Sequence, residues 1–124
     1  MFILLSSLVV SIVNVVISFE LISKDMCTIN YGVAFGIGIE YIIFLSLLLL
    51  LSLVVIGVIT KGVIKYIFFS LFLLGLSNFV IRILYGSICD YINIFNLVIN
   101  ISDLFIVLIS IYAGVYIFFF ERKK

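Results

Sequence analysis

The strongest constraint on this 124-residue chain is a set of four apolar stretches, each of a length that suits a membrane-spanning helix. A helix needs about 20 apolar residues to cross the hydrocarbon core of a bilayer. The stretches cover residues 1–19, 41–60, 63–85 and 104–120. Only 10% of the residues are charged, whereas a soluble domain carries roughly a quarter. We therefore predict an all-α integral membrane protein, a four-transmembrane-helix bundle that forms one domain over residues 1–124.

The positions of lysine and arginine predict how these helices are oriented. The cytoplasmic ends of membrane helices carry an excess of these two residue types. Five of them fall on the side of the second-to-third turn and the C-terminus, and two fall on the other side. The five are Lys61, Lys65, Arg122, Lys123 and Lys124, and the two are Lys24 and Arg82. We therefore predict that both termini are cytoplasmic and that the connections 20–40 and 86–102 face outward.

The two outward connections contain the residue types that bend a chain. Glycine, asparagine and aspartate recur between residues 30 and 38 and again between 86 and 103, and these residues favour turns. Irregular backbone at membrane depth is tolerated only where it is buried in protein or lines a wet cavity. We therefore expect the working site on this face, with a small extracytoplasmic β element, a strand or hairpin, around residues 30–35.

Two aspartates on that face, Asp90 and Asp103, are the candidates for chemistry. The chain has no histidine, which excludes catalysis by Ser-His or Cys-His pairs and by histidine-bound metals. Two adjacent carboxylates share one proton, so one can take a proton from water while the other polarises a peptide carbonyl. This predicts an aspartyl hydrolase without metal or cofactor. Alternatively, Asp103 and Ser102 cap the fourth helix and Asp90 is an ordinary interfacial residue.

Three sequence blocks resemble motifs of one known membrane-protein family. Residues 30–35, NYGVAF, are similar to an N-T-G-A-A-F stretch. Residues 75–82, GLSNFVIR, followed by 86–92, GSICDYI, resemble a G-x-x-N-x-x-D-R…G-x-V-x-D-F-I block, and residues 100–103, NISD, resemble N-x-A-D. In these motifs, which occur in the same order and cover the chain from residue 30 onward, the chain resembles the lipoprotein signal peptidase (signal peptidase II) family.

The resemblance implies a membrane endopeptidase that removes signal peptides from lipid-modified prolipoproteins at the outer membrane–water interface. It implies that Asp90 and Asp103 form the catalytic dyad. The residues that it implies for substrate binding are Asn30, Gly32, Asn78, Arg82 and Asn100. The expected partners are signal peptides that carry a diacylglyceryl-cysteine and membrane lipids, with no nucleic acid and no cofactor. The expected location is the bacterial cytoplasmic membrane.

The chain departs from the family pattern at three positions. Ile81 stands where the family has an acidic residue, and Asn14 and Ser18 stand where its first helix has an acid and a lysine four residues apart. These changes leave open an alternative, a non-catalytic relative that binds lipidated peptides or another membrane protein. A transporter or channel subunit ranks last, because the cytoplasmic half is almost purely apolar.

The two cysteines, Cys27 and Cys89, fall on the same predicted side of the membrane. Their number and spacing fit neither a disulfide framework nor a C-x-x-C motif. A single disulfide and two free thiols therefore both stay open.

Overall fold

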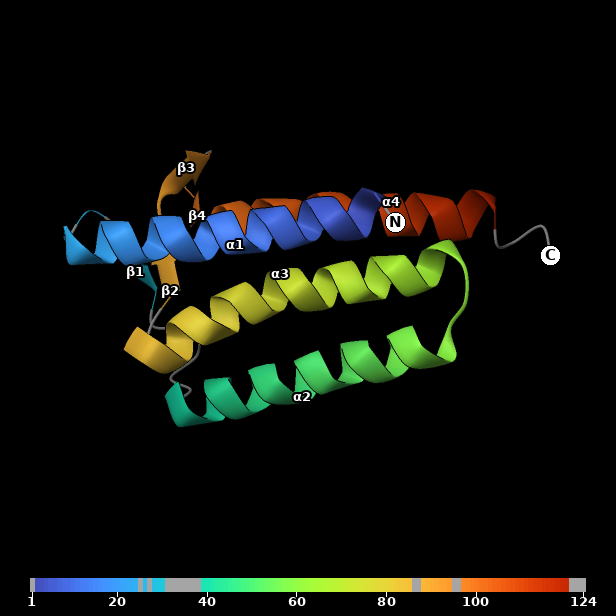
Figure 1. Ribbon diagram of the computed structural model, residues 1–124, viewed down its shortest axis with the longest axis horizontal. Coiled ribbons are helices and arrows are strands. Elements are labelled where there is room, and N and C mark those ends of the chain that lie inside the picture. Colours follow the sequence, from blue (N-terminus) through green and yellow to red (C-terminus); the bar gives the residue numbers. More distant parts are fainter. Residues whose placement is uncertain are drawn as a thin grey trace.

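The computed structural model describes residues 2–24, 26, 28–30, 39–85, 88–94 and 97–120. Its four helices are α1 (Phe2–Ser23), α2 (Ile39–Ile59), α3 (Val63–Tyr85) and α4 (Ile101–Phe119). All four are long and apolar enough to span a membrane, and successive helices run in opposite directions (Figure 1). This agrees with the predicted helical bundle of a multi-pass membrane protein.

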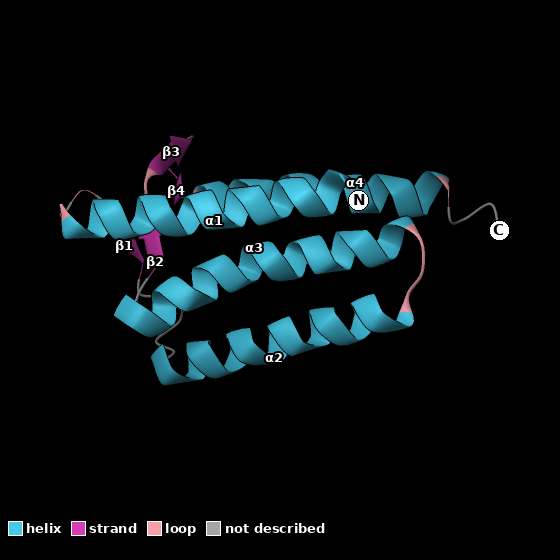
Figure 2. Ribbon diagram, viewed as in Figure 1, coloured by secondary structure: helices cyan, strands magenta, loops and turns pink. Residues whose placement is uncertain are grey.

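Helix α3 is the centre of the bundle and packs against α1, α2 and α4. Helices α1 and α4 also contact each other, whereas α2 packs mainly on α3. Figure 2 shows α2 on one side of α3, with α1 and α4 together on the other. The fold therefore has a three-helix unit, α1, α3 and α4, with α2 attached to its central helix.

Helix α1 faces the bundle with polar residues. Its buried residues are Ser7, Ser11, Asn14 and Ser18, and their spacing of four, three and four residues places them on one helical face. The other faces are apolar and largely exposed. In lipid, apolar burial does not drive helices together, so small residues that permit close packing and polar residues that bond across the interface take this role. The interior beside α1 is therefore partly polar.

Glycines set the contact between α2 and α3. Gly62, in the turn between them, has a φ of 72°, a conformation that residues with a side chain rarely adopt. A Cβ atom at Gly75 would lie 3.1 Å from the Cδ2 atom of Leu50 on α2. The absence of a side chain at Gly75 therefore lets the two helices approach closely.

The strands gather at the end of the bundle opposite the α2–α3 turn (Figure 1). Strand β1 (Thr28–Asn30) pairs antiparallel with β2 (Ile88–Asp90), so that Thr28 lies opposite Asp90. Strands β3 (Ile92–Ile94) and β4 (Leu97–Ile99) form a second antiparallel pair. The strands in 88–99 were not expected from the sequence. The predicted element at 30–35 is described only at Asn30, and which side of the membrane holds the strands stays a prediction.

Three helices differ in extent from the prediction, and the smallest difference is in α2, which covers Ile39–Ile59 rather than 41–60. Helix α1 continues to Ser23 rather than ending at 19. At its end, Lys24 Nζ forms an ion pair with Glu20 Oε1 at 3.1 Å. Helix α4 starts at Ile101 rather than 104, because the residue before it caps the helix, as described next.

Candidate active site

The site begins at the N-terminus of α4, which Asn100 caps. The backbone of Asn100 is extended, with φ −109° and ψ 173°, and its Oδ1 accepts a hydrogen bond from the Asp103 amide at 3.0 Å. Asp103 Oδ2 accepts in return from the Asn100 amide at 3.4 Å. This is a capping box. The N-cap residue is therefore Asn100, and the expectation that Asp103 helps to cap this helix is confirmed in part, because its side chain completes the capping box.

Asn100 also contacts the second candidate carboxylate. Asp90 ends strand β2 and is only 3% exposed. The Asn100 side-chain amide donates to Asp90 Oδ1 at 3.3 Å, while its backbone amide donates to Asp103. One residue is thus hydrogen-bonded to both aspartates. The fold brings Asp90 and Asp103, thirteen positions apart in sequence, to the same place.

Asn78 on α3 is the hub of the cluster. Its Nδ2 donates to Asp103 Oδ1 at 3.0 Å, and its Oδ1 accepts from Asn100 Nδ2 at 2.9 Å. The same oxygen accepts from Asn14 Nδ2 at 3.2 Å. The Asn78 amide therefore joins α1, α3 and the start of α4. Four of the predicted site residues, Asn78, Asp90, Asn100 and Asp103, form one hydrogen-bonded group.

Arg82 lies one turn after Asn78 on α3 and reaches towards α2. Its Nη1 donates to Ser46 Oγ at 3.0 Å. Its Nε is buried and has no hydrogen-bond partner among the described residues. The arginine also interacts electrostatically with Asp103 and Asp90. Ser46 is thus an anchor for Arg82 that was not expected from the sequence.

The remaining predicted residues belong to the segment before α2. The backbone of Asn30 pairs with Ile88 in the β1–β2 ladder, so Asn30 lies on the strand next to the one that carries Asp90. Gly32 and Cys27 lie outside the described residues, so their predicted roles stay predictions. Cys89 is opposite Ile29 in the same ladder. The backbone of β1 thus lies alongside Asp90. The resemblance implies that this segment, with Asn30 and Gly32, contacts the substrate.

Several members of the network were not expected from the sequence. Asn14, treated there only as a departure from the family, is fully buried and donates to Ser77 Oγ at 3.3 Å. Ser77 in turn shares a hydrogen bond of 2.7 Å with Ser102. A buried asparagine in a membrane-spanning helix is expensive in lipid and needs a partner. That cost was the signal that could have identified Asn14.

Tyr91, directly after Asp90, was also missed. Its hydroxyl donates to Asn14 Oδ1 at 2.8 Å and accepts from the Ile101 amide at 3.2 Å. Burial raises the pKa of the Tyr91 phenol above its usual range; the hydrogen bond from Ile101 opposes this, and the charges of Asp103 and Asp90 add to it. The phenol therefore stays protonated, and remains a donor, well beyond neutral pH.

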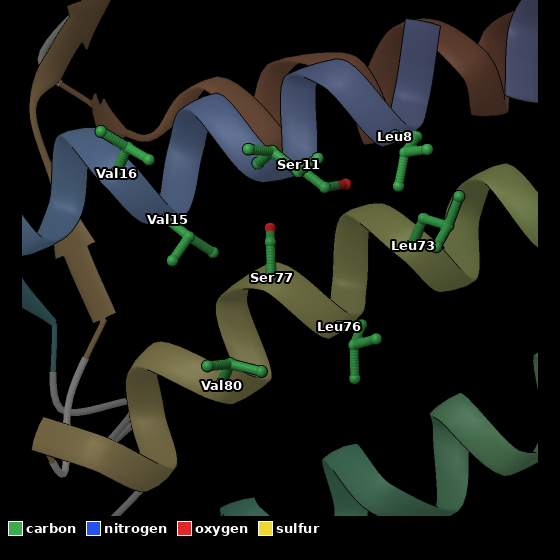
Figure 3. A pocket seen from close by; sticks show the side chains of 9 residues that line it. Leu8, Ser11, Val15, Val16, Leu73, Leu76, Ser77 and Val80 are labelled. Atoms are coloured by element: carbon green, nitrogen blue, oxygen red, sulfur yellow. The ribbon is translucent and has the colours of Figure 1, made fainter. Parts of the chain in front are cut away.

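An apolar groove of about 280 Å³ runs between α1 and α3 towards this network. Its walls include Leu8, Val16, Leu73 and Val80, and Ser77 points from α3 towards α1 across it (Figure 3). Because Ser77 also bonds to Asn14 and Ser102, the groove and the polar network share a wall. An apolar ligand in the groove would thus end beside polar groups.

Comparisons with protein-family models, with curated proteins and with solved structures find no match for this chain. The resemblance to signal peptidase II therefore rests on its three sequence blocks. What the geometry adds is chemical: two carboxylates held by neutral amides, with an arginine nearby. Such a group is suited to general acid–base work on a water molecule.

Proposed function

We propose that this protein is an intramembrane aspartyl endopeptidase that removes signal peptides from lipid-modified prolipoproteins. The observation that carries the proposal is the double contact of Asn100 with Asp90 and Asp103. Carboxylates near hydrocarbon are costly and usually functional. Two of them, converging from β2 and α4 on one amide residue, are a suitable pair for shared-proton catalysis.

The reaction is hydrolysis of a peptide bond by water. The ionised carboxylate takes a proton from a water molecule while the oxygen of that water bonds to the carbonyl carbon of the peptide. The protonated carboxyl group donates a hydrogen bond to the carbonyl oxygen and then transfers its proton to it. The first carboxyl group then gives the proton it took from water to the amide nitrogen, and the second takes back a proton from a hydroxyl of the tetrahedral intermediate as the C–N bond breaks. This releases an amine and a carboxylic acid and restores the singly protonated pair. In this scheme Asn78 and Asn100 hold the carboxyl groups, and no metal or cofactor takes part.

Arg82 is the proposed substrate-binding cation. Its anchor on Ser46 uses Nη1, and the buried Nε has no partner among the described residues. A guanidinium presents several donors in a fixed plane, so the donors of Arg82 that are not bound to Ser46 are suited to a carbonyl oxygen of the bound peptide. The β1 strand, with Asn30, and Gly32 beyond it supply the other proposed contacts.

The proposed location is the bacterial cytoplasmic membrane, with both termini in the cytoplasm and the strands at the outer surface. The excess of lysine and arginine at the opposite end supports this orientation. The signal helix of the substrate would enter laterally from lipid, and its diacylglyceryl-cysteine would stay at the interface. Cysteine labelling tests the orientation: Ser87→Cys should react with an impermeant reagent from outside, and Lys65→Cys should not.

A second candidate is a non-catalytic relative that binds lipidated peptides. One observation favours it: both oxygens of Asp103 already accept hydrogen bonds, from Asn78 and from the Asn100 amide, as in a purely structural capping box. A binding protein would retain a diacylglyceryl-modified prolipoprotein without cleaving it. Turnover therefore separates the two functions.

The experiment is cleavage of a diacylglyceryl-modified prolipoprotein by purified protein in detergent micelles. The wild type should release the signal peptide, and Asp90→Asn should not. Glu20→Gln is the matched control, because it makes the same chemical change in an exposed residue at the end of α1 and should cleave normally. Binding of the prolipoprotein without cleavage by the folded wild type would favour the second candidate.

A further inference from the structure

Asn14 and Tyr91 are joined by a hydrogen bond that spans 77 positions of the sequence. Asn14 is fully buried in the middle of α1. Its Nδ2 is directed to Ser77 and Asn78 on α3, which leaves Oδ1 to accept from the Tyr91 hydroxyl at 2.8 Å. The amide of Asn14 is therefore oriented by three partners at once.

The Tyr91 hydroxyl has a second bond, which fixes its direction. It accepts from the Ile101 amide at 3.2 Å, and Ile101 is the first residue of α4. Amides in the first turn of a helix have no partner within the helix, so the phenol satisfies a group that would otherwise be unpaired. Because the oxygen accepts there, its own proton is available for Asn14.

The backbone around Tyr91 is fixed as well. The Tyr91 amide donates to the Ile99 carbonyl at 3.1 Å, so the ring enters the bundle from an anchored position. Tyr91 follows Asp90 directly, and Ile101 precedes Asp103 by two residues. The hydrogen bond between the Tyr91 hydroxyl and the Ile101 amide, called here the Tyr91 bridge, therefore joins two residues that each lie within two positions of a carboxylate.

We propose that Tyr91 and Asn14 are positioning residues that hold Asp90 and Asp103 at a working separation; this inference rests on the proposed peptidase function. Tyr91 fixes the start of α4 relative to β2, and Asn14 ties that bridge to α1 and, through Asn78, to Asp103. Tyr91 bonds to the amide of Ile101, two residues before Asp103, and Asn14 is linked to Asp103 through Asn78. Their effect is on geometry, so they should govern turnover more than substrate binding.

The test uses Tyr91→Phe, Asn14→Leu and the double variant of the full-length protein in micelles. Tyr112→Phe is the matched control, because it removes the same hydroxyl from a half-exposed position on α4. Two quantities are measured: kcat and KM for a diacylglyceryl-modified prolipoprotein, and the hydrogen-exchange rate of the Ile101 amide by NMR. The second does not depend on catalysis, so it decides on the bridge even if the wild type proves to be no peptidase.

We expect Tyr91→Phe to lower kcat by about tenfold, the loss of one buried hydrogen bond, with KM changed less than about twofold. Exchange at Ile101 should accelerate by roughly tenfold, and the double variant should be little worse than either single one. The control should match the wild type. Unchanged Ile101 exchange and unchanged kcat in Tyr91→Phe would overturn the proposal. The proposal would also be overturned if both single variants unfolded, or if a destabilised single variant kept a normal kcat. In either case the role of the bridge would be structural only.

Discussion

Helix α3 has two sides with opposite chemistry. Towards α1 and α4 it presents Ser77 and Asn78, whose hydrogen bonds reach Asn14, Ser102 and Asp103. Towards α2 its contacts depend on close packing: a Cβ atom added at Gly75 would lie only 3.1 Å from the Cδ2 atom of Leu50. Both sides hold helices together in lipid, but only the polar side brings titratable groups together. In a membrane protein the polar interface is thus the place to look for chemistry.

The largest expected effect is on the polar side. We expect Asp90→Asn and Asp103→Asn each to reduce cleavage by at least about a thousandfold, and the double variant to be no worse, because the two groups act as one unit. The measurement is kcat/KM in micelles. A double variant whose loss is the product of the two single losses would show that the aspartates act independently.

Arg82 lies where the two sides meet, since it binds Ser46 on α2 and interacts electrostatically with both aspartates. Arg82→Leu should lower cleavage by about tenfold or more, because a charge-assisted hydrogen bond to the substrate is lost. Thermal stability should be unchanged or higher, because leucine costs less in lipid. Ser46→Ala, the control, removes only the anchor and should have a smaller effect. A destabilised Arg82→Leu protein whose folded fraction cleaves normally would remove Arg82 from the site.

A substitution on the α2 side should lower the stability of the protein and leave kcat unchanged. Leu50 is only 5% exposed, and Leu50→Ala leaves a gap against α3. The expected cost is about 1–2 kcal/mol of unfolding free energy, less than in a soluble core because lipid replaces part of the apolar contact. Denaturation in mixed micelles measures it. A large fall in kcat without loss of stability would contradict the division between the two sides.

The smallest effect is expected at Ser7, on the polar face of α1 but remote from the network. Its hydroxyl is buried and has no hydrogen-bond partner among the described residues. Ser7→Ala should therefore change stability by less than about 0.5 kcal/mol, or raise it slightly. The same denaturation assay applies. A loss above about 1 kcal/mol would mean that Ser7 bonds to something in the membrane-embedded protein.

The sequence predicted the four spans, because apolar length is a local property, and the resemblance to signal peptidase II implied that Asn78, Asp90, Asn100 and Asp103 belong to one site. The sequence did not predict which face of each helix packs inward. A helix such as α2 is apolar all round, so it has no periodic pattern from which to read its packed face. The Asn14–Tyr91 and Ser46–Arg82 contacts depend on that choice of face. They link distant segments and became visible only in the fold.

The most direct measurement of the central claim is the pH dependence of signal-peptide release from a diacylglyceryl-modified prolipoprotein by the wild type. A pair of carboxylates that shares one proton is active only in its singly protonated form, so kcat/KM should pass through a maximum and fall at both low and high pH. Asp90→Asn should show no such maximum. A folded wild type that binds the prolipoprotein but releases no signal peptide at any pH would contradict the account.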